Sequence, residues 1–217
     1  MAISEQVRAE CRQLMDRYPQ DRSALVPMLH LLQSEQGMVT AEGLELCAEL
    51  LDLSTAEVRA VATFYTMYRL RSQGGEHHIG VCVNTACGLL GGDAIFDALS
   101  KRLSVSNGEV TADGRFTLER IECQAACTHS PVVTVDWEYF DQMDIDKMMD
   151  VIDKLEAGEE VVATRGPAVR GWRAAEKTIA GIDDGLGYKS DAIDSLMLAG
   201  LNQAKERGET APDPKDF

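Results

Sequence analysis

VCVNTACG (residues 81–88) and ECQAACTHSP (residues 122–131) are the stretches that decide the fold of this 217-residue chain. Cys82 and Cys87 have four residues between them, Cys123 and Cys127 have three, and 35 residues separate the two pairs. Thiolate is a soft ligand that selects zinc, copper(I) or the iron of iron-sulfur clusters. Four thiolates are the usual number of ligands for one zinc ion or one cluster. The two pairs therefore predict a single metal centre formed by two loops.

Three kinds of site use close cysteine pairs, and the sequence favours one of them. The chain opens with MAISEQVRAE, which lacks a basic and apolar leader, so we do not expect export to a compartment where disulfides form. A structural zinc site is the serious alternative, but zinc pairs most often have two residues between the cysteines. A spacing of four recurs in plant-type 2Fe-2S ligation. We interpret the four cysteines as the ligands of a 2Fe-2S cluster.

The residues around each pair indicate where the cysteines lie in the fold. HHIGVCV (77–83) reads as a strand that ends at the first ligand, and residues 84–92 read as a loop. GDAIFDALSKRL (92–103) has apolar residues at helical spacing, with Asp93 placed to complement the helix start. FTLERIEC (116–123) reads as a second strand. Both cysteine pairs are therefore predicted on loops at strand ends.

The rest of this region completes an α/β domain. PVVTVDWEYF (131–140) alternates as a hairpin with Asp136 near its turn, and DIDKMMDVIDKLEAG (144–158) is an amphipathic helix closed by Gly158. A strand, helix and strand imply a right-handed crossover and a parallel pair, which the hairpin extends in antiparallel fashion. This is the plan of a thioredoxin-like domain. The chain lacks a C-x2-C pair at the head of the first helix, so dithiol exchange is not expected.

At these residues the sequence resembles a known family, the thioredoxin-like 2Fe-2S subunit (NuoE type) of respiratory NADH:quinone oxidoreductase, complex I. The resemblance covers about residues 5 to 160 and rests on Cys-x4-Cys, on Cys-x3-Cys followed by Pro131, and on VATFYTMY (61–68). Members of that family often carry proline before the second ligand and glycine between the last two, where this chain has Ala86 and Ala125. All four ligands are present, so the departures concern loop detail and not the cluster.

The resemblance implies a role in electron transfer. The 2Fe-2S cluster would exchange single electrons with the FMN of a partner, a NuoF-type subunit that also binds NADH, and other subunits of the peripheral arm would be further partners. The implied location is peripheral, on the cytoplasmic side of the bacterial inner (plasma) membrane. Similar subunits serve NAD-dependent formate dehydrogenases and hydrogenases, which is the first alternative. A zinc-binding interaction module is an alternative of another class.

Two further segments flank the predicted cluster domain. Residues 1–71 read as a helical lobe in which Thr40 and Ser54 can cap helices, and Ser54 with Glu57 forms a capping box. The Gly-rich break SQGGE (72–76) separates it from the 2Fe-2S domain at 77–158. Residues 159–217 have two short helical patterns but no complete domain pattern, and we expect an extension that docks on partner subunits or is partly disordered.

Composition and the remaining motifs exclude several functions. The net charge is -15 and the pI is about 4.6, which disfavours binding to nucleic acid or anionic membranes. No apolar run approaches the roughly 18 residues of a membrane span. GLLGGDA (88–94) is not a phosphate-binding glycine loop, and we predict no catalytic residues, so NADH and FMN are expected on a partner. Cys11 and Cys47 are expected in the core, and His129 is not expected to be a ligand.

Overall fold

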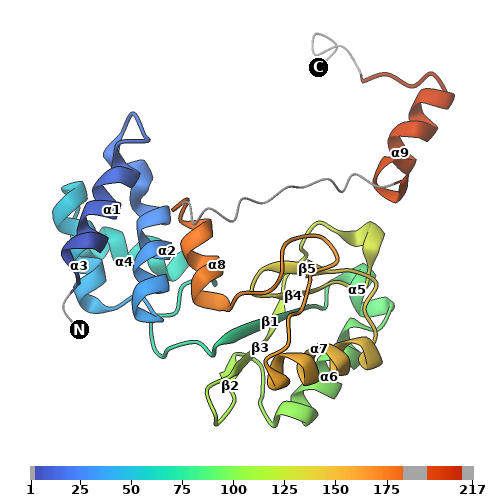
Figure 1. Ribbon diagram of the computed structural model, residues 1–217. Coiled ribbons are helices and arrows are strands. Elements are labelled where there is room, and N and C mark those ends of the chain that lie inside the picture. The colour runs from blue at the N-terminus through green and yellow to red at the C-terminus, as the bar shows by residue number, and fades with distance from the viewer. Residues whose placement is uncertain (1–2, 183–194, 212–217) are drawn as a thin grey trace.

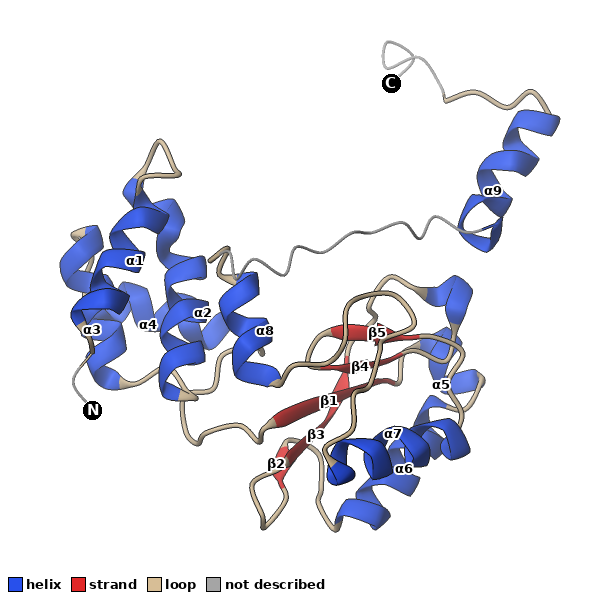
Figure 2. Ribbon diagram, in the orientation of Figure 1, coloured by secondary structure: helices blue, strands red, loops and turns tan. Residues whose placement is uncertain are grey.

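The structure is a computed structural model that describes residues 3–182 and 195–211. A lobe of helices formed by the first part of the chain lies beside a five-stranded sheet (Figures 1 and 2). Residues 183–194 and 212–217 of the predicted extension lie outside the described residues. This arrangement confirms the predicted α/β class with helices at the N-terminus.

The N-terminal lobe is built from helices whose caps are visible in the sequence. They are α1 (Glu5–Met15), the 3-10 helix η1 (Asp21–Ala24), α2 (Leu25–Gln36), α3 (Ala41–Leu51) and α4 (Thr55–Phe64). Thr40 caps α3 through the Gly43 amide, and Ser54 and Glu57 form the predicted capping box at α4. These bonds satisfy amides that the first helical turn leaves without partners.

The core of this lobe contains the two cysteines outside the paired set. Cys11 and Cys47 are fully buried, as predicted. Burial raises the pKa of the Cys11 thiol to about 11 and raises the pKa of the Cys47 thiol further. Because a buried, protonated thiol is a poor ligand and nucleophile, both side chains act as small apolar groups.

The sheet has the order β2-β3-β1-β4-β5. Its strands are β1 (His77–Cys82), β2 (Glu109–Val110), β3 (Phe116–Ile121), β4 (Val133–Val135) and β5 (Glu138–Phe140). β1 pairs in parallel with β3 and antiparallel with β4, and β4 and β5 form the expected hairpin. Because β1 and β3 are parallel and adjacent, their carboxyl ends meet at one edge, with Cys82 opposite Ile121. The sequence did not predict the short edge strand β2.

Two helices cover one face of the sheet and share its core (Figure 2). They are α6 (Gly92–Leu103) and α7 (Ile145–Ala157). Asp144 caps α7 at its start and Gly158, in the left-handed conformation, ends it. Residues 84–92 were predicted as a loop, but a short helix, α5 (Thr85–Leu89), occupies most of that stretch. Five residues are too few to show helical periodicity in a sequence.

The chain after α7 returns to both parts of the molecule. Residues 161–169 fold back on themselves through a bridge between Val162 and Ala168. The segment runs beside the β4–β5 hairpin, where Arg165 bridges to Tyr139. Helix α8 (Trp172–Ile179) then packs against α2 of the N-terminal lobe (Figure 1). The sequence did not predict this packing. The division of the chain into a helical lobe (1–71), a 2Fe-2S domain (77–158) and an extension (159–217) stays a prediction.

Helix α9 (Ser195–Glu206) follows the undescribed stretch and has no buried residue. Neither described part of the chain contains a helix that is both long and apolar enough to span a bilayer.

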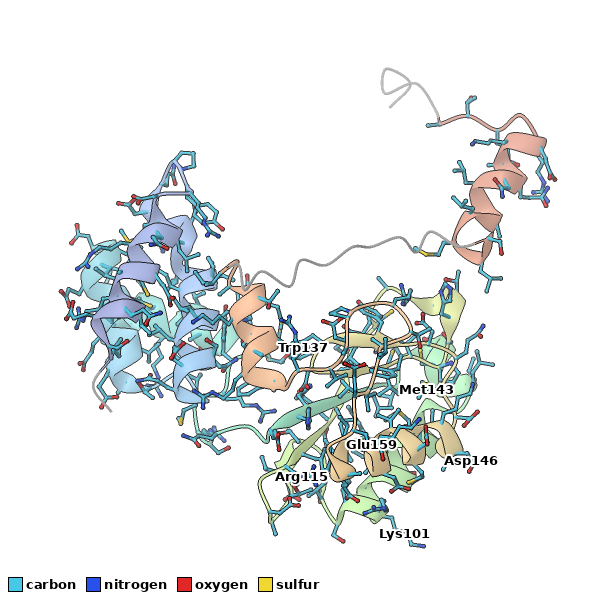
Figure 3. The ribbon with its side chains drawn as sticks, in the orientation of Figure 1. Lys101, Arg115, Trp137, Met143, Asp146 and Glu159 are labelled. Carbon is cyan, nitrogen blue, oxygen red and sulfur yellow. The ribbon has the colours of Figure 1, made fainter. Side chains whose placement is uncertain are left out.

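Glu176 joins the two parts of the molecule through hydrogen bonds from three directions. Its carboxylate is fully buried, with His30 Nδ1 2.6 Å and Gln33 Nε2 2.9 Å from Oε2. Trp137 Nε1, in the hairpin turn, donates to Oε1 at 3.1 Å. Figure 3 places Trp137 on the side of the sheet that faces α8. Because α2 and the hairpin both bind this one carboxylate of α8, Glu176 fixes the N-terminal lobe against the sheet.

Candidate metal centre

The four paired cysteines lie in two neighbouring segments at the carboxyl ends of parallel strands, although they are not all on loops as the sequence predicted. Cys82 is the last residue of β1 and Cys87 lies in α5. Cys123 follows β3, and Cys127 begins the 3-10 helix η2 (Cys127–His129). The parallel pairing of β1 with β3 therefore brings together cysteines that are up to 45 positions apart in the sequence, as 127 minus 82 is 45.

The sulfur atoms lie close together within each pair. Cys123 Sγ lies 3.5 Å from Cys127 Sγ. The Cys87 thiol is within hydrogen-bonding reach of Cys82 and acts electrostatically on Cys127. At a metal–sulfur distance of about 2.3 Å, two thiolates of one tetrahedral metal stand about 3.8 Å apart. The spacing of Cys123 and Cys127 therefore suits two ligands of one metal ion.

The close contacts among these candidate ligands are between the members of each pair. In residues 3–182 and 195–211, no three His, Cys, Asp or Glu side chains converge closely enough to hold a single metal ion. Two separate thiolate pairs match a cluster in which each of two irons takes two cysteines. The donor set therefore fits a 2Fe-2S cluster, with Cys82 and Cys87 buried on the inner side and Cys123 and Cys127 exposed on the outer side.

Backbone amides that follow Cys82 and Cys123 in the chain donate hydrogen bonds to the Cys82 sulfur. Burial raises the pKa of the Cys82 thiol, while hydrogen bonds from the amides of Asn84 and Gln124 lower it. At the outer pair, the hydrogen bond with Cys123 raises the pKa of the Cys127 thiol. Amide donors stabilise negative charge on sulfur, so they favour both metal binding and uptake of an electron by a cluster.

The start of α6 holds the first loop in place through a very close backbone approach. A Cβ atom on Gly92 would clash with the carbonyl oxygen of Cys82 and lie 2.9 Å from that of Cys87. Real Cβ atoms do not approach backbone atoms this closely, so the loop and α6 would have to separate. Gly92 thus fixes the relative positions of the two inner cysteines.

We expect Gly92→Ala to lower the stability of the cluster-loaded protein by about 1–3 kcal/mol, because the backbone clash cannot be relieved by a side-chain rotation. The measurement is thermal unfolding together with iron content. Gly43→Ala, in helix α3, is the matched control, since its added methyl group would meet side-chain atoms at no less than 3.5 Å. Equal stability of the two variants would contradict the expectation.

Ala125, between the two outer cysteines, has a left-handed backbone with φ +56°. A Cβ atom is strained in this conformation and glycine is not. The chain has alanine where the resembling family often has glycine, at a position whose backbone conformation favours glycine. The outer loop carries strain at this residue.

We therefore expect Ala125→Gly to stabilise the loaded protein by about 1 kcal/mol, which is about 2–4 °C in Tm for a chain of this size. Ala86→Gly, in α5, is the control and should act in the opposite direction, because glycine weakens a helix. Thermal unfolding followed by the visible absorption of the cluster measures both. A destabilising Ala125→Gly would show that the loop relaxes its strain once a metal is bound.

Exposed apolar side chains lie next to the centre. Leu89 is 84% and Leu90 is 63% exposed, and both come shortly after Cys87 in the chain. The sequence pattern placed them in a loop and indicated no role for them. Exposed leucines this close in the chain to a candidate ligand are typical of a surface that another protein covers.

His129 lies near the outer cysteines but is turned into the protein. It is buried, and its Nδ1 lies 2.9 Å from Thr128 Oγ1. The peptide bond between Ser130 and Pro131, which follow it, is cis.

Comparison with known proteins places the chain in a family. The thioredoxin-like [2Fe-2S] ferredoxin family matches residues 11–156. The NuoE-type subunit of the NADH-quinone oxidoreductase of Mycobacterium tuberculosis is 42% identical over 215 residues, which are 97% of this chain and 83% of that protein. The corresponding subunit of Rickettsia conorii is 39% identical over 147 residues, covering 66% of this chain and 87% of that protein.

A solved structure shares the fold. An NAD+-reducing [NiFe]-hydrogenase in the air-oxidised state aligns with a TM-score of 0.55 and 20% identity, over 62% of this chain. This chain spans 23% of the hydrogenase chain that it matches, so the likeness supports the fold alone.

The matched residues include the whole sheet and both cysteine pairs. The resemblance drawn from the cysteine spacings and from residues 61–68 is thereby confirmed, as is the thioredoxin-like fold. The chain belongs to the thioredoxin-like [2Fe-2S] ferredoxin family, among the NuoE-type subunits of NADH-quinone oxidoreductase.

Proposed function

We propose that Cys82, Cys87, Cys123 and Cys127 hold one 2Fe-2S cluster, and that the chain is the electron-transfer subunit of the NADH-oxidising part of an NADH-quinone oxidoreductase. The carrying observation is the donor set: two close pairs of thiols at neighbouring strand ends, with the Cys123 and Cys127 sulfurs 3.5 Å apart, which suits two irons that each take two cysteines. Family membership supports the same cofactor. The zinc-binding module is therefore the weaker alternative.

When bound, a 2Fe-2S cluster takes up and returns one electron at a time. The residues of this chain set the conditions for that exchange. The amides of Asn84 and Gln124 stabilise negative charge at Cys82, whereas a chain with a net charge of -15 opposes added negative charge. Cys123 and Cys127 lie on the solvent side, where a partner can approach closely.

The partner must accept two electrons together from its donor and pass them on one at a time. NADH gives a hydride, and a flavin can accept it and release electrons singly. We place FMN and the NADH site on a NuoF-type subunit that covers Leu89 and Leu90, and we place the assembly on the cytoplasmic face of the bacterial inner membrane. The relatives named above are quinone oxidoreductase subunits, so the formate dehydrogenase and hydrogenase alternative is less supported.

Anaerobic mixing tests this function. The cluster-loaded chain is combined with NADH, first alone and then with the flavin-containing subunit of the same organism. We expect the visible absorption of the oxidised cluster to be bleached only when the flavoprotein is present. Bleaching by NADH alone, or no bleaching with the flavoprotein, would contradict the proposal.

A further inference from the structure

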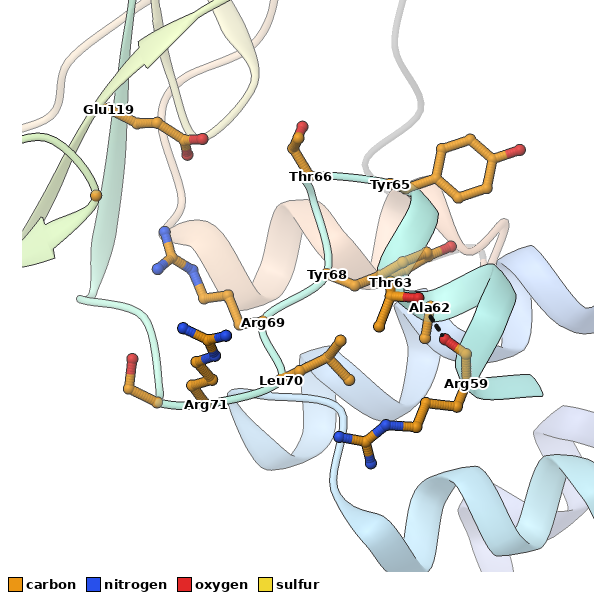
Figure 4. A pocket seen from close by; sticks show the side chains of 12 residues that line it. Arg59, Ala62, Thr63, Tyr65, Thr66, Tyr68, Arg69, Leu70, Arg71 and Glu119 are labelled. Atoms are coloured by element: carbon orange, nitrogen blue, oxygen red, sulfur yellow. Dashed lines mark hydrogen bonds between the residues drawn. The ribbon is translucent and has the colours of Figure 1, made fainter. Parts of the chain in front are cut away.

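Three arginines line one cleft between the N-terminal lobe and the sheet. Arg59 comes from α4, and Arg69 and Arg71 come from the segment that leads from α4 to β1 (Figure 4). The cleft has a volume of about 510 Å³. Glu119 is the acidic residue among the described lining residues, and its carboxylate is engaged by His78 Nε2 at 2.8 Å. A concentrated positive charge is unexpected on a chain with a net charge of -15.

None of these guanidinium groups forms a hydrogen bond or an ion pair within the described ranges. Other arginines of the chain do: Arg102 contacts both Asp153 and Glu156, and Arg165 binds Asp141 through two nitrogens. Arg69 lies over the ring of Trp172, 5.4 Å from its centroid, and burial lowers its pKa. The charges of Glu119 and Glu176 act on Arg69 without a direct bond, and Arg59 and Arg71 are exposed. A partly desolvated cation such as Arg69, with no directly bonded carboxylate, gains the most from an incoming anion.

Two neighbouring exposed aromatic side chains, Phe64 and Tyr65, lie at the end of α4, and Tyr65 reaches the same cleft. Phe64 is 78% and Tyr65 is 45% exposed, and the two rings pack edge to face. Tyr65 also lines the cleft (Figure 4). Arginine and aromatic residues are the types that dominate binding energy at protein interfaces. The combination points to a protein segment and not to a lone small anion.

The cleft continues toward the metal centre. A second cavity, of about 420 Å³, shares Thr66 and Glu119 with the first. Its other lining residues include Ile121, Gln124, Trp137 and Tyr139. Gln124 is the residue between Cys123 and Ala125, and its carbonyl oxygen accepts a hydrogen bond from Tyr139 Oη at 3.1 Å. We call the two adjoining cavities the interlobe groove.

We propose that the interlobe groove binds an acidic segment of the flavin- and NADH-binding subunit, with carboxylates over Arg59, Arg69 and Arg71 and apolar side chains beside Trp137 and Tyr139. This inference rests on the proposed function, because the partner is the one that delivers electrons. Charge complementarity selects an acidic segment. The continuity of the groove with the Cys123 loop means that docking there also holds the partner next to the outer cysteines.

A first experiment asks whether the groove binds a polyanionic chain. The protein has two tryptophans: Trp137 lines the groove, and Trp172 is buried under Arg69, so their fluorescence reports on the occupancy of the groove. The cluster-loaded chain is titrated at low salt with poly-L-glutamate, and in parallel with inorganic pyrophosphate. We expect a saturable change with poly-L-glutamate that Arg69→Gln/Arg71→Gln weakens tenfold or more. Saturation by pyrophosphate alone would assign the site to small phosphates and overturn the proposal.

A second experiment uses the flavoprotein subunit itself. Its affinity for the wild-type chain is measured at about 0.05 M and about 0.3 M salt, which spans strong and weak electrostatic attraction. We expect Arg69→Gln/Arg71→Gln to weaken binding at least tenfold at low salt and to flatten the salt dependence. Arg12→Gln, an exposed arginine of α1 outside the groove, is the matched control and should bind as the wild type does.

The outcomes separate this proposal from the proposed function. The iron content of each variant is measured first; no candidate ligand lines the cleft that holds the arginines, so their replacement should leave the cluster intact. If the wild type accepts electrons from the flavoprotein and the double variant binds it equally well, the groove proposal is wrong and the function stands. If the wild type neither binds the flavoprotein nor accepts its electrons, the proposed function fails.

Discussion

Replacing Cys87 with serine should remove the cluster. The iron content should fall from about two atoms per chain to near zero, and the visible colour should be lost. Cys87 is buried in α5, within hydrogen-bonding reach of Cys82 and near enough to Cys127 to act on it electrostatically. Serine is a harder and far less acidic ligand, and no other described cysteine lies near enough to replace it, since Cys11 and Cys47 are buried in the other lobe. Iron analysis and visible spectroscopy on the purified variant measure the effect.

Cys123→Ser should also lower the iron content, but by less than Cys87→Ser does, because Cys123 is exposed and a solvent-side ligand is more easily substituted. Cys11→Ala is the control and should retain full iron content. A Cys87→Ser protein with wild-type iron content would show that these thiolates are not the ligands.

Removing the Glu176 carboxylate should loosen the two parts of the molecule. Glu176→Ala leaves His30, Gln33 and Trp137 without their shared acceptor in a buried site and opens a cavity. Each of these effects costs about 1–3 kcal/mol in comparable cases, and we expect a total loss of about 3–5 kcal/mol of unfolding free energy. That loss is about 6–20 °C in Tm for a chain of this size.

Two variants calibrate this result. Glu160→Ala removes an exposed carboxylate and should change Tm little. Glu176→Gln keeps an acceptor oxygen and should fall between the wild type and Glu176→Ala. A Glu176→Ala protein with the same Tm as the wild type would mean that α8 does not hold the lobe against the sheet.

Elements with local signals could be predicted from the sequence. The strands at 77–82 and 116–121 and the helix at 92–103 have clear apolar periodicity, and Ser54 and Glu57 mark the start of α4 within four residues. The metal centre was predicted from the same kind of signal, because its candidate ligands come in close pairs. The meeting of the pairs followed from the parallel pairing that a strand, helix and strand imply.

Features that depend on distant contacts were not predicted. Glu176 meets His30 across 146 positions and Gln33 across 143, and neither partner is marked by any local pattern. The interlobe groove likewise joins α4, β3 and the hairpin, so no local pattern marks its arginines. The strain at Ala125 is a backbone property that spacing does not reveal.

The metal content of the anaerobically purified protein tests the central claim most directly. Iron and zinc are assayed, and visible and low-temperature EPR spectra are recorded before and after dithionite. We predict a red-brown protein with about two irons per chain that gains a one-electron EPR signal on reduction. A colourless protein with about one zinc ion per chain would contradict the cluster assignment and identify the four cysteines as a structural site.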